Sequence, residues 1–403
     1  WLPMATFAGA ACALAQALFR MLRRSSRLSS YECGPENDLD RESAKIGRKD
    51  VTLEFCRKLP KVELHAHLHG SIRDETLLDL MRENSRKVMK GFKGQKANIE
   101  LEKMRVELKE ERTLAQCFKL FSLIHSLVAS LDIVTRITVE VLEDFSRENV
   151  RYIELRTTPR DSPELGITPR SYVQAVIKGF KLAKSKNLPI EPRLLLSVNR
   201  GSNDLNAALR TIDLAIEYSR KEERYVVGVD FSGNPYGRGF KYFLPAFEKA
   251  RKAGLKCAIH CGEVENHDDT TDIIKFQPER LGHAVRLNCI HSKMLQNLKL
   301  PIEICPTSNM RTLKLTDINQ HPTLSKWVES NYPYCICTDD SGVFRTSLSE
   351  EIYLAAKAGS LSPHQVSKLC IDAVGMTFLD KREKSRLKEK LEIVTYEAWQ
   401  RWR

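Results

Sequence analysis

The chain has 403 residues, of which 42% are apolar and 29% are charged. These values are typical of one large globular domain or two ordinary ones, and they exclude an intrinsically disordered chain. The net charge of +12 is scattered over helix-like segments instead of forming one basic, aromatic-laced patch, so we expect no nucleic-acid partner. No apolar run reaches the roughly 20 residues that a membrane span needs, so we expect no membrane association.

The cysteines favour a reducing, cytoplasmic compartment. There are eleven, an odd number, and most lie inside apolar runs, as Cys257 and Cys305 do. Buried free thiols fit this pattern better than a disulfide framework. No Cys-x-x-Cys pair occurs, so a zinc site built from thiolates is not expected.

The first 48 residues differ in composition from the rest. Residues 1–31 carry four arginines and no acidic residue, which resembles an organelle transit peptide, although an untranslated region read as protein would look the same. Residues 32–48 are polar and charged and indicate a linker. We therefore predict a disordered or transit-like extension over 1–48 and one folded domain over 49–403.

The segment 61–71 is an alternating strand that carries three histidines. His65 and His67 occupy the same parity, so in an extended strand they share a face at a separation of roughly 6.6 Å. Two imidazoles at that separation can converge on one divalent ion. His69 follows on the same parity, and Gly70 is expected to turn the chain out of the strand. The alternative is a solvated surface strand, so the metal hypothesis depends on finding further ligands.

Helical patterns flank this strand. A helix-like segment, 51–59, precedes it and ends at Pro60. Residues of about 72–148 are dominated by helical spacing and form a predicted helical insertion. Within the insertion, 113–128 has apolar residues at spacings of three and four, which predicts an amphipathic helix. His125 lies on or beside its apolar face, where a packing role is the default interpretation.

Short apolar runs then alternate with helix-length segments to the end of the chain. With the histidine strand they make eight predicted strands, the others being 152–156, 193–198, 226–231, 256–260, 280–285, 302–305 and 334–338. Strands without polar alternation, each followed by a helix, indicate a parallel sheet buried on both faces. Eight such units predict a single (β/α)8 barrel of the TIM type, with the helical insertion after strand 1. The alternative, an open doubly wound sheet, lacks a Gly-x-Gly-x-x-Gly segment after its first strand.

In such a barrel the chemistry gathers at the carboxyl ends of the strands, where five of the ten histidines lie. His65, His67, His260 and Asp339 offer three neutral nitrogens and one hard oxygen, with room for a water, as in a catalytic metal site. A metal ion there would lower the pKa of a bound water to near 7. Glu263 follows His260 by three residues and suits a proton donor. His283 suits a general base or an electrostatic partner of the attacking oxygen, and both roles stay open.

Several ordered motifs resemble one known family of metal-dependent barrels, the adenosine deaminases. The resemblance runs from about Leu59 to the C-terminal helices. Its motifs are 61–71, Phe231-Ser-Gly, His260-Cys-Gly-Glu263, Gly282-His283 and Cys337-Thr-Asp-Asp340. The segments 154–160, 305–309 and 339–344 are similar to the adenosine deaminase-like branch, which acts on N6-methyl-AMP.

The resemblance implies one Zn²⁺ per chain on His65, His67, His260 and Asp339. It implies Glu263 as the proton donor to purine N1, and His283 as the residue that assists attack at C6. Substrate contacts are expected from His67, His69, His125, Thr157, Thr158, Pro159, Arg160, Asn199, Gly233, Glu263 and Asp340. Among these, Gly233 and Asp340 would hold the ring nitrogens of the purine.

Two positions depart from the family pattern. Adenosine deaminases proper have an aspartate at the position of His69, where a carboxylate would repel a 5′-phosphate and a protonated histidine would attract one. The branch usually has asparagine there, and Asn199 likewise replaces an aspartate. Arg160, with Thr157 and Thr158, would form a phosphate clamp.

The sequence therefore predicts a monomeric cytoplasmic hydrolase that binds a small purine nucleotide and removes its C6 amine. The leading substrate is N6-methyl-AMP, which would give IMP and methylamine. One alternative is an adenosine deaminase that acts on free nucleosides. Another is a catalytically inactive nucleotide-binding barrel, against which Glu263 and His283 argue. A two-metal hydrolase with a carbamylated lysine is a third, but Lys256 lies at the wrong end of its strand.

Overall fold

A computed structural model of the chain describes residues 50–89, 114–202 and 204–402. The predicted N-terminal extension and part of the predicted insertion lie outside these residues. From Val51 on, the described residues belong to one compact unit, Val51–Arg403. None of the described helices is both long enough and apolar enough to cross a bilayer.

Eight parallel strands form one sheet in the order β1 to β8, each paired with the next along the chain. They are β1 (Lys61–His67), β2 (Val150–Thr157), β3 (Glu191–Asn199), β4 (Val226–Ser232), β5 (Lys256–Cys261), β6 (Arg280–His283), β7 (Ile302–Ile304) and β8 (Tyr334–Ile336). The chain after β8 returns to β1, where Asp339 N donates to His65 O at 2.7 Å and His67 N donates to Asp339 O at 2.9 Å. These bonds bring the two edges together, and the predicted (β/α)8 barrel is confirmed.

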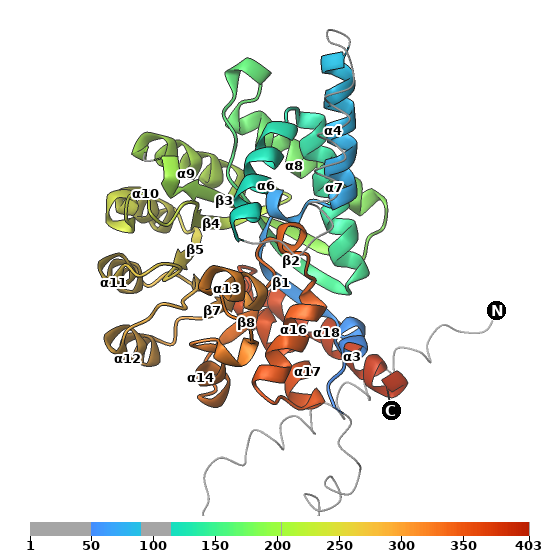
Figure 1. The fold of residues 1–403 in the computed structure, drawn as a ribbon, viewed down its shortest axis with the longest axis vertical. Coiled ribbons are helices and arrows are strands. Elements are labelled where there is room, and N and C mark those ends of the chain that lie inside the picture. Colours follow the sequence, from blue (N-terminus) through green and yellow to red (C-terminus); the bar gives the residue numbers. More distant parts are fainter. Residues whose placement is uncertain (1–49, 90–113, 203, 403) are drawn as a thin grey trace, which may run out of the picture. The chain divides into compact units, whose positions relative to one another are not determined.

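Helices surround the strands and connect them (Figure 1). Those before and between β1 and β2 are α3 (Leu53–Lys58), α4 (Asp74–Met89), α6 (Leu114–Leu127) and α7 (Leu131–Arg147). Between β2 and β7 lie α8 (Pro169–Ser185), α9 (Leu205–Ser219), α10 (Phe240–Lys252), α11 (His267–Phe276) and α12 (Cys289–Leu298). After β7 come α13 (Pro306–Leu313), α14 (Leu324–Glu329), α15 (Ser341–Phe344), α16 (Leu348–Ala358), α17 (Pro363–Met376) and α18 (Lys381–Trp402).

Local sequence explains where these helices begin and what they bury. The side chain of Thr168 accepts a hydrogen bond from Ser171 N and caps α8, and Ser362 caps α17 in the same way. In α7, Val134, Ile137 and Val141 are buried at helical spacing. The main hydrophobic core thus lies between the strands and the surrounding helices.

Two boundaries near the histidines differ from the sequence prediction. β1 ends at His67, and His69 lies in the 3₁₀ turn η1 (His69–Ser71) instead of on the strand. A β-bulge also interrupts the pairing of β1 with β2 between Glu63 and Ala66. Leu68, just before this turn, adopts a right-handed helical backbone conformation, so the alternation of the strand stops before His69. β6 ends at His283, two residues before its predicted end, because His283 and Ala284 both adopt a left-handed backbone conformation.

The cysteines follow the expected pattern in the part of the chain that is described. All nine cysteines there are free thiols, and all but Cys289 are buried. Burial raises the pKa of the Cys257 thiol, with a smaller contribution from the nearby Glu279 carboxylate. These thiols therefore act as small apolar core residues.

Candidate active site

Four ligand atoms converge at the carboxyl ends of the strands. His260 Nε2 lies 3.1 Å from His65 Nε2 and 3.2 Å from His67 Nε2. Asp339 Oδ1 lies 3.3 Å from the Nε2 atoms of both His65 and His67. Ligand atoms bonded at about 2.0–2.1 Å to a tetrahedral zinc ion lie roughly 3.3 Å apart. The three nitrogens and one oxygen therefore fit a single zinc ion.

His283 borders the same space without completing this set. One of its ring nitrogens lies within 4.8 Å of ligand atoms of His65, His260 and Asp339. Its Nε2, however, is 4.0 Å from Asp339 Oδ2, farther than His67 Nε2 is from Asp339 Oδ1. The position of His67 therefore matches the other three candidate ligands more closely than that of His283, which lies beside them.

Neighbouring side chains hold Asp339 in place. Its backbone has a φ of 63°, a left-handed conformation that costs a non-glycine residue roughly 1–3 kcal/mol. Ser308 Oγ donates to Asp339 Oδ2 at 2.6 Å. The buried carboxylate of Glu63 accepts hydrogen bonds from His65 N and Thr338 N, which ties β1 to the residues just before Asp339. Although burial opposes its ionisation, hydrogen bonds from His65 and His67 hold the pKa of Asp339 well below the ordinary value.

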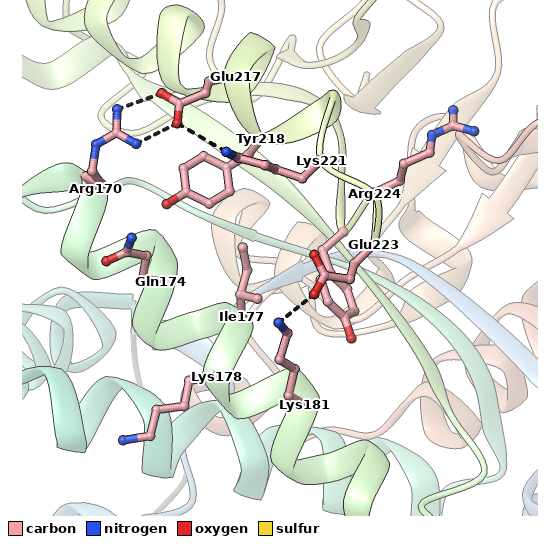
Figure 2. A pocket seen from close by; sticks show the side chains of 11 residues that line it. Arg170, Gln174, Ile177, Lys178, Lys181, Glu217, Tyr218, Lys221, Glu223 and Arg224 are labelled. Carbon is pink, nitrogen blue, oxygen red and sulfur yellow. Dashed lines mark hydrogen bonds and ion pairs between the residues drawn. The ribbon is translucent and has the colours of Figure 1, made fainter.

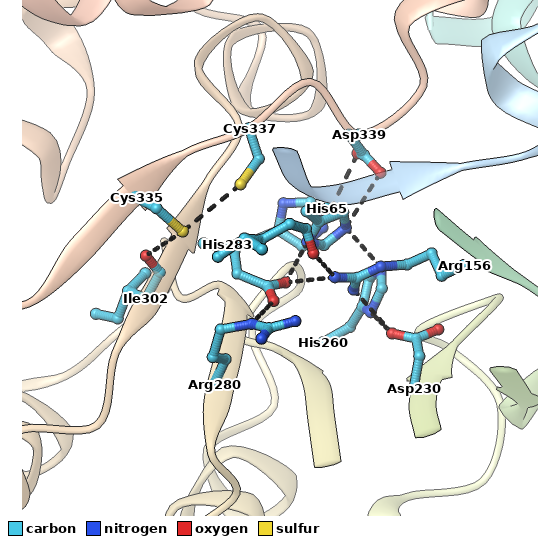
Figure 3. Close-up of polar contacts among 12 residues, drawn as sticks. His65, Arg156, Asp230, His260, Arg280, His283, Ile302, Cys335, Cys337 and Asp339 are labelled. Atoms are coloured by element: carbon cyan, nitrogen blue, oxygen red, sulfur yellow. Dashed lines mark hydrogen bonds and ion pairs between the residues drawn. The ribbon is translucent and has the colours of Figure 1, made fainter. Parts of the chain in front are cut away.

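A carboxylate stands behind each of two ligand histidines (Figure 3). His65 Nδ1 lies 2.6 Å from Glu303 Oε2, and His260 Nδ1 lies 3.1 Å from Asp230 Oδ1. Arg156 joins these two carboxylates, since its guanidinium donates to Asp230 and to Glu303, both at 2.9 Å. Such outer contacts fix the orientation of a ligand imidazole and increase its basicity.

The row of buried ion pairs continues from Glu303 toward the amino end of the barrel. Arg280 Nε donates to Glu303 Oε1 at 2.5 Å, and its Nη2 donates to Glu154 Oε2 at 2.6 Å. Glu154 in turn accepts a hydrogen bond from Phe378 N, and the Arg280 guanidinium stacks 3.7 Å from the Phe378 ring. Phe378, between α17 and α18, packs against Leu195 on β3. A buried ion column therefore runs from the junction of the last two helices to the histidine cluster.

Glu263 and His283 face each other over the cluster. Glu263 Oε1 lies 3.8 Å from His283 Nε2, and Glu263 Oε2 is buried with no hydrogen-bond partner among the described residues. Burial, reinforced by the Asp339 carboxylate, raises the pKa of Glu263 to about 7. Burial lowers the pKa of His283 well below its ordinary value. The pair thus presents an acid that can hold a proton beside a neutral imidazole.

Asp340 approaches the backbone at Gly70 so closely that no side chain fits there. A Cβ atom at Gly70 would lie 1.5 Å from Asp340 Oδ1, an atom that is buried and has no hydrogen-bond partner in the described chain. Burial and the neighbouring Asp339 raise the pKa of Asp340 to about 7. At the ends of β3 and β4, a Cβ at Gly233 would lie 2.2 Å from Asn199 Oδ1. Gly233, with a φ of 99°, is therefore required by both space and conformation.

His69 lies on the side of the site formed by β2 and α8. Its Nε2 lies 3.0 Å from the hydroxyl of Tyr172, which is 2.7 Å from Thr157 Oγ1. Its ring contacts His125 edge-to-face at 5.3 Å between centroids. Burial, together with His125 and Arg160, lowers the pKa of His69 to about 3. The imidazole of His69 is therefore neutral near pH 7 and exerts no charge attraction on a phosphate.

Arg160 is anchored at the end of α6. Its Nη1 donates to the carbonyl oxygens of His125 and Val128, and its Nε donates to Ser162 Oγ. His125 is exposed, so it is not the core-packing residue of the default interpretation. Beside Arg160, Pro159 is buried and Thr158 is exposed. Arg160 is therefore held in position by protein groups alone.

Sequence reasoning missed the residues behind the ligands. Glu303 and Arg280 were given no role, although a charged residue within a short apolar strand is a signal of an inward-facing partner. Tyr172 comes from α8, and no sequence pattern connects it to His69. Arg156, Asp230 and Asn309 were recognised only as residues at strand ends.

A pocket lies on the outer layer, between α8 and the end of α9 with the segment that follows it (Figure 2). Tyr225, which lines it, immediately precedes β4, so the pocket lies toward the amino end of that strand. Its cations are matched by acids: Arg170 and Glu217 form two parallel bonds of 2.6 Å, and Lys181 lies 2.6 Å from Glu223. We assign no chemistry to this pocket.

Comparisons with known proteins agree with this site. Residues 60–394 match the family model for adenosine deaminase. The N6-mAMP deaminase of Arabidopsis thaliana is 38% identical over 357 residues, which cover 83% of this chain and 97% of that protein. The N6-methyl-AMP deaminase of Homo sapiens is 35% identical over 346 residues, or 84% of this chain and 94% of that one. The crystal structure of arabidopsis ADAL complexed with IMP is 39% identical and covers 86% of this chain and 99% of its own, with a TM-score of 0.77. The chain belongs to the adenosine deaminase family.

Proposed function

We propose that this protein is a zinc-dependent hydrolase that removes the C6 amine of a purine nucleoside monophosphate, with N6-methyl-AMP as its leading substrate and IMP and methylamine as products. The observation that carries the proposal is the convergence of four ligand atoms beside Glu263, a partly buried acid with a raised pKa. The relatives named N6-methyl-AMP deaminase, which align over nearly their whole length, support the choice of substrate.

His65, His67, His260 and Asp339 would hold the zinc ion. When bound, a zinc ion at such a site lowers the pKa of water to near 7 and so supplies a nucleophile at neutral pH. Glu303 and Asp230, behind two of the ligands, orient the imidazoles so that their Nε2 atoms face one point.

The remaining residues act on the purine. Glu263, still protonated near neutral pH, donates its proton to N1 as the attack at C6 proceeds, which places electron density on the ring. Asp340, whose pKa is also raised, holds a proton for a second ring nitrogen, and the backbone of Gly233 positions the opposite edge of the base. His283 lies beside Glu263 and would assist the attack at C6.

The side of the site around His69 suits a 5′-phosphate. Position 69 carries a neutral imidazole, so the carboxylate that would repel a phosphate is absent there. Arg160 uses three of its five N–H groups on protein oxygens, and its two Nη2 hydrogens have no partner among the described residues. A guanidinium edge held in place by other bonds binds phosphate well, because little side-chain entropy is lost. Thr157 adds a hydroxyl on the Tyr172 side of this region, 2.7 Å from the Tyr172 hydroxyl.

A comparison of kcat/KM for N6-methyl-AMP, AMP and adenosine tests the proposal, with zinc content measured on the same sample. We expect N6-methyl-AMP to be preferred over adenosine. Arg160→Ala should reduce this preference about tenfold or more by raising KM for the phosphorylated substrate only, since charge-assisted bonds contribute about 1.5–3 kcal/mol. A control substitution, Arg170→Ala, lies in the outer pocket and should change neither constant. A preference for adenosine would instead indicate a nucleoside deaminase.

A further inference from the structure

His283 is connected to two residues that no reaction step has so far used. His283 Nδ1 lies 3.0 Å from Asn309 Nδ2, and Asn309 Oδ1 lies 3.1 Å from His321 Nε2. His321 follows the 3₁₀ turn η4 (Ile318–Gln320), and Asn309 lies in α13, so the row crosses two separate elements. All three side chains are at most 5% exposed. Water therefore does not compete for these hydrogen bonds.

The direction of each bond follows from the backbone at the start of α14. The amides Thr323 N and Leu324 N both point at His321 Nδ1, at 3.4 and 3.1 Å. A backbone N–H can only donate, so His321 Nδ1 must be an acceptor. Burial lowers the pKa of His321 to about 4, so the ring is neutral and its one proton is on Nε2. His321 Nε2–H therefore donates to the amide oxygen of Asn309.

The same logic fixes His283. Since the oxygen of Asn309 faces His321, its NH₂ group faces His283 and donates to Nδ1. A nitrogen that accepts a hydrogen bond carries no proton, so the neutral His283 ring has its proton on Nε2. That nitrogen has no hydrogen-bond partner in the described chain and lies between Glu263 Oε1 and Asp339 Oδ2, at 3.8 and 4.0 Å.

We propose that His321 and Asn309 are positioning residues that fix the tautomer of His283, so that His283 presents an N–H group, and not a lone pair, to the reacting atoms. The inference rests on the proposed deaminase function and decides between the two roles that the sequence left open for His283. A ring that presents an N–H cannot remove a proton from the attacking water. It instead donates a hydrogen bond to the oxygen on which negative charge develops.

The tautomer can be measured directly, without substrate. Nitrogen-15 NMR of the zinc-loaded protein, labelled on its histidine rings, reports which ring nitrogen carries the proton, and a His283→Gln sample identifies the signals. We expect Nε2–H in the wild type. Asn309→Asp should move the proton to Nδ1, because an imidazole is more basic than the carboxylate it would face.

Kinetics of matched variants test the positioning role. His321→Leu removes the donor to Asn309 and should lower kcat about 10- to 100-fold, the usual effect of losing an outer hydrogen-bond partner. His321→Gln keeps an N–H donor at the same place and should retain kcat within about threefold of the wild type. His291→Leu is the control, because His291 is an equally buried histidine in the cap of α12, on the outer layer.

Three results would overturn the proposal: Nδ1–H in the wild type, equal kcat in His321→Leu and His291→Leu, or equal kcat in His321→Leu and His321→Gln. If the protein proves inactive on purine nucleotides, the deaminase proposal fails while the NMR result still decides the tautomer. The two inferences can therefore fail separately.

Discussion

Arg280→Met tests whether the ion column carries a substantial part of the stability. Arg280 is fully buried, pairs with Glu303 and Glu154, and also donates to Met376 O at 2.8 Å. Methionine keeps much of the side-chain volume, but the buried carboxylates of Glu303 and Glu154 each lose a cationic partner. Removing one partner of a buried ion pair costs about 3–5 kcal/mol. For a folded unit of roughly 350 residues, with an unfolding entropy of about 2.1 cal/mol/K per residue, this lowers Tm by about 4–7 °C.

The pH dependence of the stability lost in Arg280→Met distinguishes the loss of the ion pairs from a loss of packing. Burial opposes ionisation of Glu303, but Arg156 and Arg280 outweigh it and hold the pKa of Glu303 well below the ordinary value of 4.5. A carboxylate with a depressed pKa contributes stability that is full above its unfolded value and is lost as the pH falls. The difference between variant and wild type should therefore be largest at neutral pH and shrink below about pH 4.5.

Urea unfolding followed by circular dichroism, repeated across this pH range, measures the effect. The control is Arg170→Met, which breaks an exposed pair in the outer pocket and should leave the unfolding midpoint unchanged, because solvent replaces its partner (Figure 2). A loss below about 1 kcal/mol at neutral pH, or a loss that does not vary with pH, would refute the reasoning.

Three further outcomes are expected from the site. Burial and the Asp339 carboxylate raise the pKa of Glu263 to about 7, so its proton is present below that pH, and kcat/KM should fall as the pH rises through it; a flat or rising profile would contradict this role. Removal of the metal by a chelator should abolish turnover and lower Tm, and added zinc should restore both, because an ion that binds only the folded state stabilises it; turnover that survives in zinc-free protein would exclude the metal site. Gly70→Ala should displace Asp340 and raise KM at least several-fold, whereas Gly375→Ala, with nothing within 4 Å of its Cβ, should not; unchanged KM in both would show that Asp340 does not hold the base.

The barrel was predictable because its strands are short apolar runs at regular intervals. β2 to β5 each contain the whole of the predicted strand and extend it by one to three residues. The ends of β1 and β6 were not predictable in the same way. His69 lies in a turn, and His283 takes a left-handed backbone conformation that is uncommon for a residue other than glycine. The pattern of apolar residues predicts neither the turn at His69 nor the left-handed backbone of His283, because both depend on contacts between distant segments.

Much of the candidate site was predictable for a related reason. The carboxyl ends of parallel strands meet at one face of a barrel, so His65, His260 and Asp339 could be placed together from their positions alone. The neutral state of His69 was not predictable from the sequence, because its pKa depends on burial and on the nearby His125 and Arg160. The hydrogen-bonded row His321–Asn309–His283 joins three separate segments of the chain. No periodic sequence pattern connects these segments, so the row could not be predicted.

The barrel interior follows a different design from the usual one. TIM barrels generally fill their interior with layers of branched apolar side chains. Here Glu154, Arg156, Arg280 and Glu303 are fully buried within the strands, and the apolar core lies outside them, against the helices. A buried ion network is often no more stable than apolar residues of the same volume, so stability alone does not explain it. Its upper end instead contacts the Nδ1 atoms of His65 and His260, two of the proposed metal ligands, and an apolar interior of equal stability would not orient their imidazoles.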